Sequence, residues 1–464
     1  MKAAFIGGGS LRLLPIFRGI FQKTPEVFRD GEIRLIDLKL ERAEAVAKMV
    51  AACPEYQNVK CKIVTTTDVD AGLEGVDILY LTMAAVREPT ESQALILGKE
   101  YGYISSDQLS INGAFLSLRL GGFILSLAKK LEKLSPNALM LIFPNPVAVY
   151  SCMVNRFTKI KALGICGGFS NHRWDLTRLC FGKEEYDPNW NVVASGVNHL
   201  SFILRGDYKG EDLFHSLLPR IFTDSWKMME VSGPGDMKSI LEVALLELKN
   251  MYQKYGTMIF STEFDGLCHV SASGRDILWE RGINLAKGFD PEKVRAASIE
   301  EIEQRFSTFI KIAENPGDVD WTQKTVSGVP CGACLTDISI PILKAVAGFE
   351  KMRIVASRPN YGVIAGLPEN AAAEYTMDIF KDTITPVENQ YIPAPFRGLI
   401  TSLSEFQTLN AEALANKDPK LLAAAFDAYP TNQFEKSRKE FLRKMFDIYT
   451  DIDPVWRNSL DWLL

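Results

Sequence analysis

The sequence predicts an α/β fold, in which a Rossmann-type doubly wound parallel sheet is followed by a C-terminal α+β part. Short apolar runs of β type alternate with helical runs through the first third of the 464 residues, which is the pattern of a parallel sheet. Three consecutive glycines separate the first β run from the first helical run. The remainder mixes β runs with long helical stretches without regular alternation, so we expect an α+β arrangement there.

The alternation can be followed run by run. The expected strands of the first part are residues 3–8, 32–38, 62–67, 77–83, 139–145 and 160–167. The expected helices are residues 13–21, 41–53 and 123–135, followed later by 237–256 and 291–315. The pattern loosens around residue 187, so we place a domain boundary near residue 190. Residues 1–190 are then a Rossmann-like domain and residues 191–464 an α+β domain.

Composition excludes several classes of partner. With 47% hydrophobic residues and a net charge of -5, the chain is a poor candidate for binding nucleic acid. The longest apolar runs fall short of the roughly 20 residues that a membrane helix needs, so no membrane span is expected. The first apolar run is too short for the core of a signal peptide. We therefore expect a cytoplasmic protein whose eight cysteines are reduced thiols.

The glycine turn is the first candidate site. It joins a β run to a helical run, where backbone N–H groups and the positive end of a helix hold a pyrophosphate. Asp37 ends the second β run, where a carboxylate accepts ribose hydroxyls and repels a 2′-phosphate. A tight turn and a surface aspartate are the ordinary alternatives. Together with the alternation, these features predict that the first domain binds NAD through Gly7, Gly8, Gly9, Ser10 and Asp37.

A cysteine and a histidine form the second candidate site. Cys166 lies at the carboxyl end of a predicted strand, the edge where open α/β sheets build their sites, and His199 lies in a later β segment. A thiolate and an imidazole from separate strands can share a divalent ion and leave positions open for substrate oxygens. Packing is the ordinary alternative for both side chains. Cys331 and Cys334 have no second pair at a suitable spacing, and we expect them to be structural.

Two polar stretches carry candidates for proton transfer. Asp107 lies in a segment rich in serine and glycine, where it is either a turn residue or a proton donor. Arg119 lies further along and either clamps an anionic group or pairs with a carboxylate. A second stretch groups side chains that suit a general base, namely Tyr255, Glu263, Asp265 and His269.

These residues, in this order, resemble the NAD- and metal-dependent family 4 glycoside hydrolases, from the first strand to about residue 400. "IGGGS" resembles the family's opening turn, "IDL" its ribose-binding strand and "FPNP" its Asn-Pro signature. "GIC" and "GVNH" resemble its metal-ligand strands, and "PNYGVIAGLPENAAAEY" its downstream segment. The family includes α-glucosidases, α-galactosidases, uronidases and 6-phospho-glycosidases, and its fold is similar to that of the lactate/malate dehydrogenase superfamily.

The resemblance implies a glycosidase. Such an enzyme would break a glycosidic bond by NAD-dependent oxidation at carbon 3 of the sugar, proton abstraction at carbon 2 and elimination. A divalent metal would assist these steps, and manganese is the expected metal. Residues 191–464 would carry substrate, metal and oligomer contacts. The expected partner is a small carbohydrate, and the expected assembly is a homodimer or homotetramer.

The resemblance also implies roles for individual residues. Cys166 and His199 would be the metal ligands and Asp107 the acid. Asp265 is our choice for the base, with Tyr255 and Glu263 as rivals. The remaining expected contacts are Asn145 to substrate or cofactor, and Arg119 and Asn198 to substrate.

The chain departs from the family pattern in two places. Gly167 and Gly168 follow Cys166, where the family has Asn or His, and "DQLSING" replaces a Gly-Pro-Gly run. Two other functions stay open, the first because of the similar fold and the second because of these departures. One is a 2-hydroxy-acid dehydrogenase of the lactate/malate type, which uses a His and an Arg but no cysteine ligand. The other is a catalytically inactive, NAD-responsive binding protein.

Overall fold

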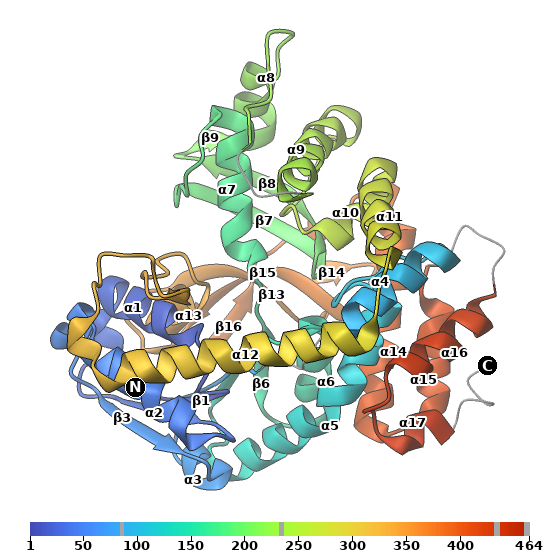
Figure 1. The fold of residues 1–464 in the computed structure, drawn as a ribbon. Coiled ribbons are helices and arrows are strands. Elements are labelled where there is room, and N and C mark those ends of the chain that lie inside the picture. The colour runs from blue at the N-terminus through green and yellow to red at the C-terminus, as the bar shows by residue number, and fades with distance from the viewer. Residues whose placement is uncertain (84–87, 232–235, 431–436, 459–464) are drawn as a thin grey trace.

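A single mixed sheet organises the protein. The computed structural model describes residues 1–83, 88–231, 236–430 and 437–458, and within them the main sheet has thirteen strands (Figure 1). Its parallel part has the order β3 (Lys62–Thr66), β2 (Glu32–Ile36), β1 (Lys2–Ile6), β4 (Ile78–Leu81), β5 (Leu139–Ile142) and β6 (Lys161–Gly164). The order 3-2-1-4-5-6 is that of the Rossmann fold, and it confirms the predicted fold class.

The parallel strands lie where the sequence predicts them. They are recognisable as apolar runs because helices cover both faces of the sheet. Residues Ala3 to Ile6 of β1 are all buried, and so is the whole of β4 and β5. Such strands read as continuous apolar runs rather than alternating ones. The covering helices include α1 (Leu13–Lys23), α2 (Leu40–Ala52), α3 (Val69–Leu73), α5 (Ile111–Leu134) and α6 (Val147–Phe157).

The sheet continues through the expected domain boundary near residue 190. Beyond β6 the order is β13 (Met352–Pro359), β15 (Ala372–Phe380), β7 (Trp190–Val197), β8 (Leu200–Tyr208) and β10 (Met258–Ile259), with β16 (Thr383–Pro386) beside β15 and β9 (Glu211–Asp212) beside β8. All of these pairings are antiparallel. The α+β part is thus an antiparallel extension of the Rossmann sheet, and a division into two domains at residue 190 stays a prediction.

An upper lobe rises from this antiparallel edge (Figure 1). It contains β7 to β9 with the helices α7 (Gly168–Phe181), α8 (Leu218–Ile221), α9 (Asp236–Tyr255) and α10 (Phe264–Val270). From there α11 (Ala272–Ala286) packs against α4 (Thr90–Tyr101) and leads into α12 (Pro291–Glu314), which crosses the front of the molecule to α2. The helix α13 (Ser339–Val346) and two small sheets are also present, β11 (Thr325–Val326) with β12 (Val329–Pro330) and β14 (Ile364–Ala365) with β17 (Gln390–Tyr391).

The C-terminal helices close the side of the Rossmann part. They are α14 (Arg397–Asn416), α15 (Pro419–Ala428), α16 (Arg438–Ile448) and α17 (Pro454–Asn458). Phe115 of α5 contacts the rings of Phe426, Phe446 and Tyr449, with centroids 5.8, 4.7 and 5.3 Å away. Among the described helices, α5 alone has the length and hydropathy of a membrane span, but 72% of its apolar window is buried, as in a core helix.

We expect Phe115→Ala to destabilise the protein by about 3–5 kcal/mol, because it leaves a cavity at the junction of α5 with the C-terminal helices α15 and α16. The midpoint of urea unfolding, followed by tryptophan fluorescence, measures the loss. Leu246→Ala is the matched control, because Leu246 on α9 is 42% exposed. Equal shifts for the two variants would contradict the packing role of Phe115.

Candidate active site

The glycine turn lies at the carboxyl end of β1 and packs directly on β2. The amides of Gly7 and Gly8 both donate to the Ile36 carbonyl, at 3.0 and 2.9 Å. A Cβ on Gly8 would lie 2.6 Å from the Ile36 nitrogen, and Gly7 has a φ of 80°. The structure therefore requires these glycines for the close approach of the turn to the neighbouring strand, in addition to any approach of a phosphate.

Asp37 is held against this turn. Its Oδ2 accepts a hydrogen bond from the Gly9 amide at 2.8 Å, and its Oδ1 accepts one from the Lys39 amide at 2.9 Å. The Ser10 amide donates to the Gly7 carbonyl at 2.9 Å, which completes the turn. The five residues predicted to bind NAD at the glycine turn thus lie together at one edge of the sheet.

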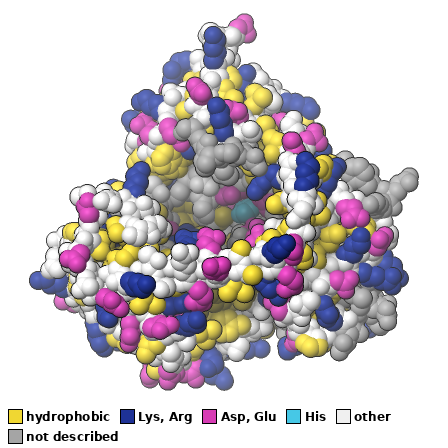
Figure 2. All heavy atoms as spheres, viewed as in Figure 1, with side chains coloured by type: hydrophobic (Ala, Val, Ile, Leu, Met, Phe, Trp, Pro, Cys, Tyr) yellow, Lys and Arg dark blue, Asp and Glu magenta, His cyan; other side chains and the backbone are white. Residues whose placement is uncertain are grey.

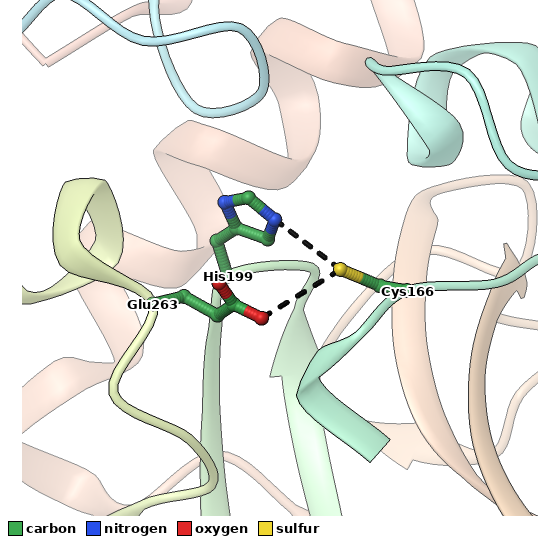
Figure 3. Close-up of side chains that lie close together, drawn as sticks. All are labelled: Cys166, His199 and Glu263. Atoms are coloured by element: carbon green, nitrogen blue, oxygen red, sulfur yellow. Dashed lines mark hydrogen bonds between the residues drawn. The ribbon is translucent and has the colours of Figure 1, made fainter. Parts of the chain in front are cut away.

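Three side chains from separate elements meet beyond the end of β6 (Figure 3). They are Cys166, two residues after β6, His199, in the turn between β7 and β8, and Glu263, directly before α10. Cys166 Sγ lies 3.4 Å from His199 Nε2, and the Cys166 thiol donates to Glu263 Oε1 at 3.7 Å. The three donor atoms lie within 4.8 Å of one another, so together they can hold a metal ion.

The backbone around His199 explains how the turn reaches this point. Val197 and Leu200 pair across the hairpin, so Asn198 and His199 form a two-residue turn in which His199 has a left-handed φ of 72°. That conformation is unusual for a residue with a side chain. Gly266 of α10 lies against the His199 carbonyl so closely that any Cβ there would collide with it. The helix that follows Glu263 is therefore packed directly on the histidine turn.

Asp265 fixes the orientation of the imidazole. Its Oδ1 lies 2.7 Å from His199 Nδ1, and its Oδ2 accepts from the Leu109 amide at 3.2 Å. With Nδ1 donating to the carboxylate, Nε2 faces Cys166 and Glu263. A carboxylate on the far nitrogen of a histidine is the usual support for a metal-binding imidazole.

Burial and neighbouring charges shift the pKa values of His199, Asp265 and Cys166. Burial opposes the charged imidazolium, but Asp265, Glu263 and Cys166 together raise the pKa of His199 well above its ordinary value. Burial alone would raise the pKa of Asp265, yet the charge and hydrogen bond of His199 hold that pKa well below its ordinary value. Burial raises the pKa of the Cys166 thiol, and the neighbouring Glu263 carboxylate adds to the rise.

A buried glutamate supports the other side of the turn. Glu374 of β15 is 4% exposed, and its carboxylate accepts from Asn198 Nδ2 at 2.7 Å and from Ser201 Oγ at 2.6 Å. Burial raises the pKa of Glu374, and the two hydrogen bonds oppose that rise. Asn198 is predicted as a substrate contact, but its side-chain nitrogen already donates a hydrogen bond to Glu374. Its Oδ1 is buried and has no hydrogen-bond partner among the described residues.

The Asp107 and Asn145 segments reach the same edge of the sheet. Gln108 Oε1 accepts from the Val147 amide at 2.9 Å, which ties the two segments together. Asp107 is partly buried two residues before Leu109, whose amide binds Asp265. Asn145 is partly buried between β5 and α6.

Two predicted residues lie elsewhere. Arg119 donates from Nε to Asp451 at 2.8 Å and stacks on the Tyr449 ring at 4.6 Å, so the carboxylate pairing named as its alternative is present. Tyr255 is 39% exposed at the end of α9 and packs edge-on against Phe396 at 5.2 Å. The structure therefore does not bring Tyr255 into the Cys166 cluster. A role for either residue in catalysis or substrate binding stays a prediction.

Cys331 and Cys334 belong to the packing of α1. The Cys334 amide donates to the Pro15 carbonyl at 2.9 Å, and the Cys331 carbonyl accepts from Arg18. Both thiols are free, and neither belongs to the candidate metal cluster within the described residues.

Sequence reasoning missed two members of the site. The sequence predicts Glu263 only as a candidate base, although it lies beside Cys166, and it does not predict a role for Glu374. Glu263 is 97 residues from Cys166, and Glu374 is 176 residues from Asn198, so no local spacing could reveal either pairing. The density of polar side chains from residue 255 to 269 was the one available signal for Glu263.

The front face of the molecule is hollowed. Figure 2 shows a hollow between the upper lobe and α12, with a histidine and acidic side chains visible inside it. A small cavity at the cluster is lined by Gly168, Asn198, His199, Ser201, Phe260, Ser261, Glu263 and Glu374.

The protein has a Rossmann sheet, which is the fold of dinucleotide-binding proteins. A thiol, an imidazole and a carboxylate at the carboxyl edge of this sheet form a candidate metal centre. Comparison with known families makes the assignment specific. The model described as family 4 glycosyl hydrolase matches residues 2–179, and the model of the family 4 C-terminal domain matches residues 194–431. The chain therefore belongs to family 4 of the glycosyl hydrolases, which confirms the resemblance predicted from the sequence.

Relatives match over nearly the whole chain. The probable 6-phospho-beta-glucosidase of Bacillus subtilis is 21% identical over 99% of both chains. The alpha-galactosidase of the same organism is 22% identical over 100% of this chain and 99% of its own. A solved 6-phospho-alpha-glucosidase from gut microorganisms, described as a complex with NAD and Mn²⁺, superposes with a TM-score of 0.74 at 17% identity, covering 97% of this chain and 98% of its own.

We expect Asp265→Asn to lower the pKa of His199 in the metal-free protein, because the largest favourable charge beside the imidazolium is removed while its burial remains. NMR titration of the four histidines measures the change, with His199→Gln to assign the signal. An unchanged pKa for His199 would contradict the coupling.

The same pair sets the pH dependence of stability. The raised pKa of His199 means that its contribution is complete below the ordinary value of 6.5 and disappears as the pH rises through the folded-state pKa. The lowered pKa of Asp265 means that its contribution is present above 3.8 and disappears as the pH falls through the folded-state pKa. The difference in unfolding free energy between the wild type and Asp265→Asn should therefore be largest in the mildly acidic range, as urea unfolding at a series of pH values would show.

Proposed function

We propose that this family 4 enzyme breaks a glycosidic bond by NAD-dependent oxidation at carbon 3 of the sugar, proton removal at carbon 2 and elimination, with a divalent metal, manganese by expectation, held by Cys166 and His199. The observation that carries the proposal is the meeting of Cys166, His199 and Glu263 at the carboxyl edge of a Rossmann sheet. The relative crystallised with NAD and Mn²⁺ supports the choice of both groups.

The residues present fit both groups. A thiolate, an imidazole and a carboxylate with 3.4 and 3.7 Å between neighbouring donors suit a transition metal or zinc. The glycine turn and Asp37 suit the pyrophosphate and ribose of NAD. When bound, NAD supplies reversible acceptance of hydride, and the divalent ion supplies Lewis-acid polarisation of an adjacent carbonyl.

The protein's own residues divide the remaining work. Asp265 keeps the His199 imidazole oriented so that Nε2 points at the cluster. Asp107 is proposed as the acid that protonates the leaving oxygen, and the segment of Glu263 and Asp265 as the source of the base. Because both oxygens of Asp265 are already hydrogen-bonded, Asp265 is better placed to position His199 than to remove a proton.

Substrate contacts and assembly follow the same expectations. Asn145 is proposed to bind a sugar hydroxyl or the cofactor. Membership of family 4 and the cysteine in the cluster argue against the lactate/malate-type dehydrogenase. The proposal also includes a small carbohydrate as the partner, a homodimer or homotetramer as the assembly, and a cytoplasmic location.

The proposal is tested with a panel of neutral and anionic aryl glycosides, supplied with NAD and Mn²⁺ under reducing conditions. We expect turnover of at least one glycoside that depends on both additions. In deuterated water the released sugar should carry deuterium at carbon 2, detected by NMR. Glycoside cleavage without deuterium at carbon 2 would favour direct displacement, and NAD binding without any cleavage would favour the inactive binding protein.

The same assay tests the cysteine. We expect Cys166→Ser to abolish metal-dependent turnover, because a hydroxyl remains protonated where a thiolate would bind the ion. Its Kd for NAD, measured by fluorescence titration, should stay within a few-fold of the wild-type value. Unaltered turnover in this variant would refute the metal role of Cys166.

Asp37→Ala tests the cofactor site. We expect the Kd for NAD to rise by about tenfold or more, because hydrogen bonds to a charged group are worth roughly 1.5–3 kcal/mol. The preference for NAD over NADP should fall as well, since the carboxylate that repels a 2′-phosphate is gone. Fluorescence titration with both cofactors gives the two values. An unchanged ratio would place the ribose elsewhere.

A further inference from the structure

We propose that Glu263 is a third protein ligand of the divalent ion, and that Gly168 is the residue that makes room for it. The inference rests on the proposed function, because it concerns the same ion. It changes the role of Glu263, which sequence reasoning treats as a rival base. It also gives a physical reason for one of the two glycines that follow Cys166.

The spacing of the donor atoms fits a shared ion. Metal bonds to sulfur, nitrogen and oxygen of about 2.0–2.3 Å place neighbouring donors about 3–4 Å apart. The Sγ to Nε2 distance of 3.4 Å and the Sγ to Oε1 distance of 3.7 Å both fall in this range. Figure 3 shows the imidazole and the carboxylate approaching the sulfur from different elements, with both facing the same point.

The carboxylate is held in this position from behind. The amide and the hydroxyl of Thr262 both donate to Asp175 Oδ2 at 2.9 Å, which ties the segment before Glu263 to α7. Burial raises the pKa of Asp175 to about 6, and the two hydrogen bonds from Thr262 oppose the rise. After Glu263, α10 is packed against the His199 carbonyl at Gly266. Glu263 is therefore anchored on both sides.

Gly168 leaves the space that the carboxylate occupies. A Cβ at this position would lie 3.1 Å from Glu263 Oε1 and 2.9 Å from Ser261 Oγ. The preceding Gly167 differs, because the nearest atom to a Cβ there would be Asn171 Nδ2 at 3.9 Å. Neither glycine has a positive φ, so an alanine is conformationally acceptable at both positions. The need for glycine at position 168 is thus a matter of room beside Ser261 and Glu263.

A second observation points to a ligand in the same cavity. Asn198 is 2% exposed, and its Oδ1 has no hydrogen-bond partner among the described residues, although it lines the cavity together with Gly168, His199 and Glu263. Its Nδ2 is engaged by Glu374, so the amide cannot turn to satisfy this oxygen without losing that bond. A buried acceptor without a partner is costly, and a water or sugar hydroxyl in the cavity would satisfy it.

The experiment measures Mn²⁺ binding to the full chain without NAD, under reducing conditions. The EPR signal of free Mn²⁺ gives the Kd. We expect Glu263→Gln to raise this Kd by roughly tenfold or more, because even residues that only support a ligand contribute about 10–100-fold to metal affinity. Glu405→Gln, which removes an exposed carboxylate on α14, should leave the Kd within about twofold.

Gly167 and Gly168 provide a matched test of whether space beside Glu263 is needed for metal binding. We expect Gly168→Ala to raise the Kd for Mn²⁺, because the added methyl group displaces the Glu263 carboxylate, while Gly167→Ala leaves the Kd unchanged. In cobalt(II)-loaded protein, the thiolate absorption band should persist in Glu263→Gln, which shows that Cys166 still binds and that the site has not collapsed. Thermal unfolding followed by circular dichroism checks that each variant is folded.

The outcomes separate this inference from the proposed function. If the wild type and Glu263→Gln bind Mn²⁺ equally well, Glu263 is not a ligand, and the metal role of Cys166 and His199 stands. Loss of turnover with unchanged Mn²⁺ affinity would identify Glu263 as the base instead. If the wild type itself binds no Mn²⁺, the metal part of the proposed function fails together with the inference.

Discussion

The hydrogen bond between His199 and Asp265 is the contact on which the site depends. Asp265 also accepts from the Leu109 amide, so a single carboxylate connects the segment before α5, the helix α10 and the turn between β7 and β8. His199 then faces Cys166 at the end of β6. Parts of the chain that are 66 and 156 residues from Asp265 are joined through one side chain. Such a buried network is costly when one partner is missing, and it therefore favours one arrangement.

The parallel half of the fold was predictable because its signals are local. Each buried strand is a short apolar run, and each crossover helix has its own periodicity, as in β1 and α1. The antiparallel half was predictable only in class. β13 joins β6, and β15 joins β7, across about 180 residues or more, and the sequence carries no local mark of these pairings. The continuation of one sheet past residue 190 depends on these non-local contacts.

The site was predictable to a similar degree. Cys166 was predictable because it lies at the carboxyl end of an expected apolar strand, and His199 because the chain has only four histidines. Neither argument applies to Glu263 or Glu374, which are ordinary glutamates until the fold brings them to the turn. Nearness in sequence was misleading for Tyr255: it ends α9, and β10 then carries the chain into the sheet before Asp265 appears on α10. Eight residues before Glu263, Tyr255 is exposed beside Phe396 rather than in the cluster.

The distribution of charge around the histidine turn also favours a bound cation. Three carboxylates surround the histidine turn, and burying a carboxylate is unfavourable unless it is paired or hydrogen-bonded. Glu374 receives two hydrogen bonds from Asn198 and Ser201, and Asp265 receives the imidazole and a backbone amide. Glu263 receives the thiol of Cys166, which is a weak donor. A divalent ion would remove the thiol proton and neutralise both the thiolate and this carboxylate, so the residue with the weakest hydrogen bond is the one that an ion would satisfy best.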